Sequence, residues 1–216
     1  MCKTFNVVPD IWSLGEWSNW LTPVSYARKA SKTDEGSKRR YDTIFFICLL
    51  DSIPDALHDD KETVHLQWSS PDDLLKSHLQ SKLKLAPPQI YEICKLLNFS
   101  DFEGLHNFTL ERRNKRVTRI FPIPVLCDDG IFVVCPGDDL YPEDPDIYGE
   151  RDPVVIEGTF QEINNKYKNH NRYVMKDKNT HRDFLNEVQF LSNVSADGNV
   201  IPITDLSFLG IPRARF

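Results

Sequence analysis

The stretch PDIWSLGEWSNWLTP, from Pro9 to Pro23, contains three of the four tryptophans of the chain: Trp12, Trp17 and Trp20. Indole rings this close together either stack on a flat ligand such as a nucleotide base or fill the core beside a sheet. A stacking platform needs basic neighbours, and few lie near these rings. We therefore interpret the stretch as one or two short strands with a turn at Gly15, with buried indoles whose N–H groups reach the rim of the core.

The composition is that of an ordinary folded protein. The chain has 216 residues, 40% of them hydrophobic and 27% charged, enough for one large domain or one domain with an extension. A net charge of −6 disfavours binding to nucleic acid or to an anionic membrane. The basic residues between Ala27 and Arg40 are interrupted by acids, which predicts a surface loop there. No apolar run approaches the roughly 20 residues that span a bilayer, and no signal peptide is expected.

The cysteines indicate a reducing environment. Their number is odd, five, and no two have C-x-x-C spacing. This argues against a disulfide framework and against a structural zinc site. Cys48 lies within the apolar run TIFFICLL, which predicts a buried thiol. Free thiols fit the interior of a cell, so we expect an intracellular protein.

Three patterns predict strands in the first two thirds of the chain. The run Tyr41–Leu50 is almost continuously apolar and of strand length. Residues Thr63–Trp68 alternate between apolar and polar, as in a half-buried strand. Asp129–Gly130 between apolar segments predicts a hairpin. Pro122 and Pro124 restrict the first strand of that hairpin to an edge or a bulge.

Three helices are predicted between residues 70 and 113. Ser70 is a good N-cap, Pro71 suits the first helical position, and acids follow in the first turn. The stripe of this helix that faces inward is Leu74, Leu75 and Leu79. The second helix lies in APPQIYEICKLLNF, with one face made of Ile90, Ile93, Cys94 and Leu97. Ser100 and Glu103 have the spacing of a capping box and open the third helix.

The remaining segments carry weaker patterns. The acidic stretch 136–152 does not have the spacing of a calcium loop and is interpreted as a solvated loop. Residues 164–183 are polar and predicted to be a loop, and two last strands are predicted in 184–191 and 199–209 around a turn at Asp197–Gly198. Strands, then helices, then more strands predict the α+β class.

No segment of the chain is a self-sufficient catalytic motif. The six histidines do not cluster, and no phosphate-binding loop, dinucleotide fingerprint or nucleophile elbow is present. Glu62 lies in a predicted loop six residues before Trp68. A carboxylate on a loop can move towards a substrate and act as a base or a metal ligand. The alternative is an ordinary solvated glutamate.

Several separated segments together resemble one family. PDIWSLGEWSNWLTP, RRYDTIFFICLL, QWSSPDDLL, LAPPQIYEICKLLNF and VLCDDGIFVVCPGDDLYPED occur in the order seen in the acyl-CoA diphosphatases of the Nudix superfamily, the nucleoside diphosphate-linked moiety X motif 19 proteins. The resemblance extends from Pro9 to Ile147 and continues more weakly into the tail. It implies cleavage of the diphosphate in CoA and acyl-CoA, dependent on Mg²⁺ or Mn²⁺. The products are 3′,5′-ADP and (acyl-)phosphopantetheine.

One element of the family pattern is missing from this sequence. Nudix enzymes bind their metal ions through a box written G-x5-E-x7-R-E-U-x-E-E-x-G-U, whose glutamates share one helix face. None of the eleven glutamates here is adjacent to another, and R-E-x-x-E-E does not occur. We therefore expect a truncated, incomplete Nudix-type mixed sheet that supplies no metal ligands and is inactive alone. The alternative is a non-catalytic protein that binds (acyl-)CoA or a nucleotide, or pairs through its exposed sheet.

The resemblance also suggests site residues and a division of the chain. Glu62 is a candidate base, because many Nudix enzymes have a loop glutamate shortly before a tryptophan. Arg39 and Arg40 are candidate contacts to substrate phosphates, with solvation in a loop as the alternative. The predicted regions are residues 1–98, the C-terminal part of a Nudix-like domain; 99–151, a helix and a β-hairpin extension; and 152–216, a polar tail with terminal strands.

The C-terminus has a weak resemblance to a targeting signal. Ala214-Arg215-Phe216 has the small–basic pattern of a peroxisomal signal but ends in Phe, where the motif has Leu. The alternative is a basic tail that carries no targeting signal, in a cytosolic or mitochondrial protein.

Overall fold

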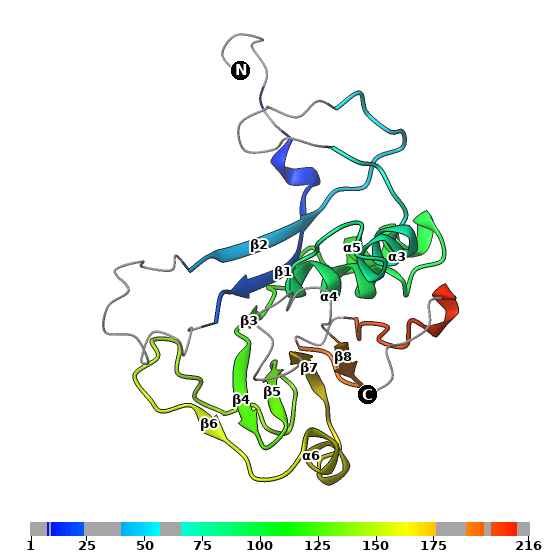
Figure 1. Ribbon diagram of the computed structural model, residues 1–216. Helices are drawn as coiled ribbons and strands as arrows, with labels where there is room; N and C mark the ends of the chain where they lie inside the picture. Colours follow the sequence, from blue (N-terminus) through cyan, green and yellow to red (C-terminus); the bar gives the residue numbers. More distant parts are fainter. Residues whose placement is uncertain are drawn as a thin grey trace, which may run out of the picture.

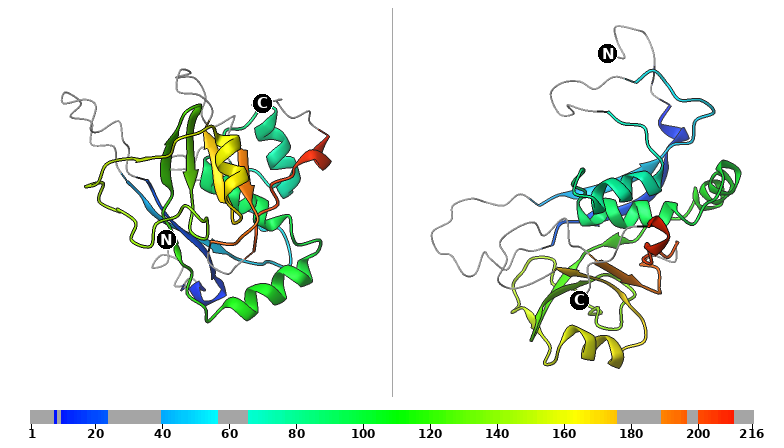
Figure 2. Two further views of the ribbon diagram at one scale, coloured as in Figure 1. Left: turned by 90° about the horizontal axis from the view of Figure 1, so that it is seen from below. Right: turned by 45° about the vertical axis from the view of Figure 1, so that its right-hand side comes forward.

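The computed structural model describes residues 8, 10–23, 40–56, 66–175, 189–196 and 200–210 (Figure 1). These residues form two sheets with helices packed on them, so the predicted α+β class is confirmed. Helices α3, α4 and α5 gather beside the first sheet, and α6 lies at the far end of the second (Figures 1 and 2). None of the helices in these ranges combines the length and apolar character that crossing a bilayer requires.

The first sheet contains strands from distant parts of the sequence. It has the order β2-β1-β3, with β1 at Gly15–Leu21, β2 at Asp42–Ile47 and β3 at Arg119–Ile120. The strands β1 and β2 are antiparallel, and β1 and β3 are parallel. The short helix η1, Ile11–Ser13, precedes β1.

In the sequence, the second sheet begins at Ile123, two residues after the end of β3. Its order is β6-β4-β5-β7-β8. The strands are β4 at Ile123–Cys127, β5 at Gly130–Val134, β6 at Val154–Val155, β7 at Asn171–Met175 and β8 at Gln189–Ser192. Helix α6, Phe160–Lys166, packs its buried Ile163 into the core of this sheet. The predicted hairpin is confirmed as β4–β5, with Asp128 and Asp129 as the turn residues, one position earlier than expected.

Trp17 and Trp20 belong to the core, as the sequence predicts, and not to a stacking platform. Their exposed fractions are 5% and 3%. The predicted position of the indole N–H at the rim is wrong for Trp20, whose Nε1 donates to the buried carboxylate of Glu92 at 2.7 Å. Glu92 also forms an ion pair with Lys95, whose Nζ lies 2.8 Å from Oε2 and 4.9 Å from the centroid of the Trp17 ring. The side chain of Trp12 is outside what the structure describes.

The helices begin with local hydrogen bonds. Helix α3, Pro71–Leu79, has the predicted N-cap, because Ser70 accepts from the backbone N–H of Asp73. Its buried side chains are Leu75 and His78, whereas Leu79 of the predicted stripe is exposed. Helix α4 spans Pro87–Leu96.

Helix α5, Phe102–Arg112, differs from the prediction at its start. Its N-cap is Asp101, and the predicted capping box of Ser100 and Glu103 is wrong. The Asp101 carboxylate accepts from the N–H of Gly104 at 2.7 Å. Ser100 instead donates its hydroxyl to the other oxygen of Asp101, so the stronger acceptor takes the capping position.

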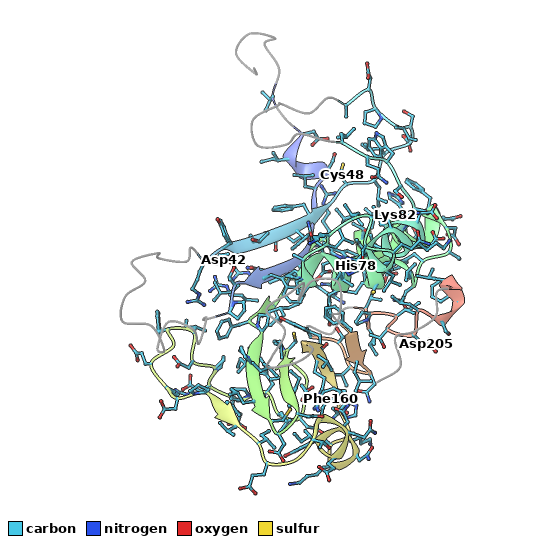
Figure 3. The ribbon with its side chains drawn as sticks, viewed as in Figure 1. Asp42, Cys48, His78, Lys82, Phe160 and Asp205 are labelled. Atoms are coloured by element: carbon cyan, nitrogen blue, oxygen red, sulfur yellow. The ribbon has the colours of Figure 1, made fainter. Side chains whose placement is uncertain are left out.

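The strand β2 is present, but its predicted burial is wrong. Ile44 and Phe46 are exposed by 43% and 52%. Cys48 is exposed as well; Figure 3 labels it beside the end of β2, opposite the end at Asp42. The physical reason is that only one face of β2 is directed towards the core, and alternate side chains of a strand point to opposite faces. Phe45 packs on that face against the cluster around Trp20, and no described residue buries the opposite face. Cys94, Cys127 and Cys135 are buried, and burial raises the pKa of the Cys94 thiol to about 12.

Two segments predicted to be solvated are part of the core. Residues 164–183 were expected to form a loop, but they contain the end of α6 and the strand β7. Asp138, from the acidic stretch expected to be a solvated loop, is buried and pairs with Arg172 of β7. Arg172 Nε lies 2.7 Å and Nη2 2.6 Å from the two carboxylate oxygens. A buried partner of opposite charge thus allows these polar segments to be interior.

The predicted strands at residues 63–68 and 199–209 do not form in the parts of those segments that the structure describes. Residues 66–70 are irregular, and Trp68 is exposed by 54%. Residues 200–210 contain no strand, but end in the short helix η3, Ser207–Leu209. The turn at Asp197–Gly198, residues 63–65 and the C-terminal residues 214–216 lie outside the described residues.

We predict that the buried Asp138–Arg172 pair contributes far more stability than the exposed Asp144–Arg151 pair. Arg172→Met leaves a buried carboxylate without its cation, which should lower the free energy of unfolding by about 3–5 kcal/mol. Arg151→Met is the matched control, and its effect should be much smaller because its pair is solvated. Urea unfolding of both variants measures this, and equal losses would contradict the prediction.

Candidate functional site

Arg40 is the one predicted site residue that the structure describes. Its guanidinium donates from Nε to the carbonyl of Thr22 at 2.9 Å and from Nη1 to the carbonyl of Ile147 at 2.6 Å. The cation also lies over the ring of Phe121, 5.5 Å from its centroid. The remaining nitrogen, Nη2, is buried and has no hydrogen-bond partner among the described residues. Arg40 therefore connects the β1–β2 hairpin to the loop after β5 through Nε and Nη1. Its Nη2 group takes no part in this connection.

The other two predicted residues, Glu62 and Arg39, lie outside the described residues. Their roles, Glu62 as a base and Arg39 as a contact to substrate phosphates, stay predictions. The contacts of Arg40 with Phe121 and Ile147 were not predicted. No local sequence signal indicates them, because they join Arg40 to residues 81 and 107 positions away in the chain.

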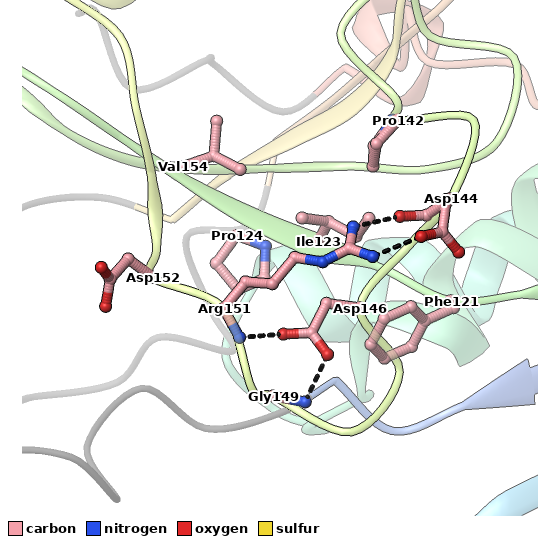
Figure 4. Close-up of a pocket in the computed structure, with 10 residues that line it drawn as sticks. All are labelled: Phe121, Ile123, Pro124, Pro142, Asp144, Asp146, Gly149, Arg151, Asp152 and Val154. Atoms are coloured by element: carbon pink, nitrogen blue, oxygen red, sulfur yellow. Dashed lines mark hydrogen bonds and ion pairs between the residues drawn. The ribbon is translucent and has the colours of Figure 1, made fainter.

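A hollow of about 110 Å³ lies beside this contact, between β4 and the loop that follows β5 (Figure 4). Phe121, which stacks under Arg40, is also part of its wall. Asp146 accepts from the N–H groups of Gly149 and Arg151 at 2.8 and 2.7 Å, and these backbone bonds, that of Arg151 first, lower the pKa of the carboxyl group. The Arg151 side chain forms an ion pair with Asp144, which raises the pKa of the guanidinium.

The charged side chains around this hollow therefore pair mainly with groups of the same loop. The Asp144 carboxylate pairs with the Arg151 guanidinium, and the Asp146 carboxylate accepts from backbone N–H groups. Such a site offers little attraction for a phosphate group. The loop instead has a clear structural effect, because it places the Ile147 carbonyl against Arg40.

A second hollow, of about 230 Å³, lies between the start of β1, the end of β2 and α5. Its wall is a mixture of aliphatic and polar residues: Ser13, Leu14, Gly15, Ile47, Leu49, His106, Thr109, Leu110 and Arg113. The sequence analysis did not identify this hollow. Its wall combines residues near 15, 48 and 110, which only the folded chain brings together.

A catalytic metal ion requires several oxygen or nitrogen ligands that converge on one point. Across the described ranges, no three His, Cys, Asp or Glu side chains form such a group. The residues described do not fit a Mg²⁺ or Mn²⁺ site.

Comparison with known proteins places the chain in a family. A model described as the NUDT19 Nudix domain matches residues 1–96, and one described as the NUDT19 C-terminal domain matches residues 124–182. The chain belongs to the NUDT19 family. Arg40 lies in the Nudix match, and its acceptor Ile147 lies in the C-terminal match. The hydrogen bond between them therefore joins the two matched parts of the family.

Curated relatives agree with the family models. The chain is 43% identical over 156 residues to an acyl-coenzyme A diphosphatase NUDT19 of Xenopus laevis, covering 72% of this chain and 39% of the relative. The protein of the same name from Homo sapiens is 41% identical over 68% of this chain and 36% of the relative. A putative nudix hydrolase 7 of Caenorhabditis elegans is 26% identical over 60% of this chain and 39% of the relative.

The chain thus spans about two fifths of the length of the curated relatives that it matches. No solved structure matches it. The division at residues 98 and 151 stays a prediction; strand pairs cross both boundaries, since β3 pairs with β1 and β7 pairs with β5.

We predict that Arg40→Met loosens the junction between the two matched parts. The change removes two hydrogen bonds from a charged donor and one cation–ring contact, so the free energy of unfolding should fall by about 1.5–3 kcal/mol. Arg40→Lys, which keeps the charge but not the forked geometry, should restore only part of it. Denaturant unfolding measures both variants. If Arg40→Met is as stable as the wild type, the contact does not stabilise the junction.

Proposed function

We propose that the chain is part of an enzyme that hydrolyses the diphosphate of CoA and acyl-CoA to 3′,5′-ADP and (acyl-)phosphopantetheine. The observation that carries the proposal is its 41–43% identity to curated acyl-coenzyme A diphosphatases over 68–72% of its length. In this reaction water adds to one phosphorus atom while the bond from that atom to the bridging oxygen breaks. We propose this activity for a protein of the length of those relatives.

For this chain alone we propose negligible hydrolysis. The family implies a divalent metal ion, Mg²⁺ or Mn²⁺, that polarises the diphosphate and activates water. The sequence lacks the R-E-x-x-E-E pattern, and the described residues contain no group of metal ligands. Glu62 cannot form such a site by itself, because a hard cation takes several oxygen ligands.

The expected result of an assay follows from this. The purified chain, incubated with octanoyl-CoA and Mg²⁺ or Mn²⁺, should release 3′,5′-ADP no faster than buffer with metal. The matched control is the Xenopus laevis relative, assayed in parallel by chromatography of the products. Metal-dependent turnover by this chain would contradict the proposed inactivity while supporting the proposed reaction.

The catalytic and substrate-binding roles of the predicted site residues are also proposals. We propose Glu62 as the base, and Arg39 and Arg40 as contacts to the substrate phosphates. The support for Arg40 is its fixed guanidinium with one nitrogen, Nη2, that has no partner in the described part of the chain. This nitrogen is buried, so a phosphate would reach it only if a neighbouring group moved.

A second candidate function is binding without catalysis, of (acyl-)CoA or a nucleotide. It is favoured by the lack of a metal-ligand group in the described residues together with a well-packed core around Trp20 and Tyr91. A protein that folds but cannot bind metal can still retain the part of the site that recognises the substrate.

We predict that CoA stabilises the chain if this second function is correct. A ligand that binds the folded state at 100 times its Kd stabilises it by about 2.7 kcal/mol and raises Tm. The variants Arg39→Gln and Arg40→Gln should reduce the shift in Tm. Differential scanning fluorimetry across a CoA titration measures it, with adenosine as the control ligand that lacks phosphates. If millimolar CoA leaves Tm unchanged, the binding function is excluded.

A further inference from the structure

A dense run of positive charge lies at the end of α5. Residues 111–119 contain five cationic side chains and a single acid, Glu111. The whole chain has a net charge of −6, so the rest of it is more acidic than that value. A negative net charge disfavours contact with an anionic surface only where the charge is evenly spread. The end of α5 can therefore face an anionic partner although the chain as a whole is acidic.

Stabilisation of the helix accounts for only part of this charge. Cations in the last turn interact favourably with the helix dipole. Arg112 ends the helix and Arg113 is its C-cap, and the Arg112 guanidinium also lies 5.6 Å from the centroid of the Phe108 ring. The effect of the dipole ends within that turn, whereas Lys115 and Arg116 lie beyond the cap. Both are exposed, and neither is in an ion pair with another described residue.

Exposed aliphatic side chains lie beside these cations. Leu110, in the last turn of α5, is exposed by 50%, and Leu14 by 39%. Both line the same hollow as Arg113, which places them next to the charged run. Ile11, in the short helix η1 that precedes Leu14, is exposed by 59%. Figure 2 shows α5 at the outer edge of the molecule in both views, with η1 near it. A flat surface can therefore meet the cations and the aliphatic side chains together.

This combination of side chains discriminates among anionic partners. Nucleic acids are bound through cations and through aromatic side chains that stack on the bases, and no aromatic residue occurs between residues 109 and 119. An anionic membrane takes cations at its phosphate groups and aliphatic side chains about 5–10 Å into the boundary of head groups and acyl chains. The end of α5 fits the membrane better than the nucleic acid.

We propose that the end of α5, formed by Leu14, Leu110, Arg113, Lys115 and Arg116, docks reversibly on an anionic lipid surface. Each cation near such a surface strengthens binding about fivefold. A few cations with two or three aliphatic side chains give a weak association that salt reverses, and not a permanent anchor. The proposal rests on this surface alone and is independent of the proposed hydrolysis.

The first test is sedimentation of the full chain with lipid vesicles. Vesicles of phosphatidylcholine are compared with vesicles that also contain about 30 mol% phosphatidylserine, which gives them a negative surface potential. At about 0.1 M salt we expect at least about fivefold more protein on the anionic vesicles, and loss of this difference at about 1 M, where the screening length falls from about 10 to 3 Å. Equal sedimentation with the two kinds of vesicle at low salt would overturn the proposal.

The second test locates the binding at the end of α5. The double variant Lys115→Gln/Arg116→Gln removes the two cations beyond the helix cap and should weaken binding to the anionic vesicles at least about tenfold. The matched control is Lys166→Gln/Lys168→Gln, which removes two exposed cations at the end of α6, at the far end of the second sheet, and should leave binding unchanged. Equal losses in the two double variants would show that net charge alone governs binding, and the proposal would be wrong.

The third test separates a membrane from other polyanions. Leu110→Ser shortens an exposed aliphatic side chain without changing any charge, and should weaken binding to the anionic vesicles about threefold. It should leave binding to heparin, a polyanion without an apolar region, unchanged. Leu79→Ser is the control, because Leu79 is a helical leucine exposed by 37% that lies on α3. If heparin competes fully with the vesicles and Leu110→Ser weakens neither interaction, the run is a general polyanion site and the lipid proposal fails.

Discussion

The buried ion pair between Glu92 and Lys95 on α4 is the interaction on which the first sheet depends. The two side chains are exposed by 6% and 1%, and removing such charges from water is costly unless each has good partners. Those partners are the tryptophans of β1: the Trp20 indole N–H donates to Glu92, and the Trp17 ring lies against the Lys95 ammonium group. The three tryptophans near the N-terminus are thus explained in part, because two of them join the sheet to the helix that covers it.

The second sheet also contains a buried ion pair whose members have further hydrogen-bond partners. Asp138 and Arg172 are fully buried and make a two-pronged contact, which Asn171 extends because its backbone N–H donates to the same carboxylate. Asn171 also accepts from the hydroxyl of Tyr91 on α4, so the polar network reaches the first core. The two sheets therefore share a continuous interior, in which hydrogen-bonded polar groups fix the orientation of the apolar ones.

Local chemistry explains which features could be predicted from the sequence. The Ser70 cap, the Pro71 start of α3 and the β4–β5 hairpin depend on neighbouring residues and were predicted correctly. The burial of Arg172 and Asp138 depends on a partner 34 positions away, so composition suggested a loop. Cys48 was assigned to the core from its apolar neighbours, although it follows a strand, β2, of which only one face is covered. Of the candidate site, Arg40 was predicted, but its partner Ile147 and the hollow at Gly15 arise from tertiary contacts alone.

The parallel pairing of β1 with β3 has a consequence for synthesis on the ribosome. Asn19 and Trp20 pair with Arg119 and Ile120, so the first sheet cannot close until the chain has been translated beyond residue 120. Until then β1 can pair with β2, but Trp17 and Trp20 have neither β3 nor a complete core, and such late, non-local closure slows folding. The indole rings of Trp17 and Trp20 therefore stay incompletely covered while residues 22–120 are made, and chaperones that recognise aromatic segments can bind there a stretch that later forms the core.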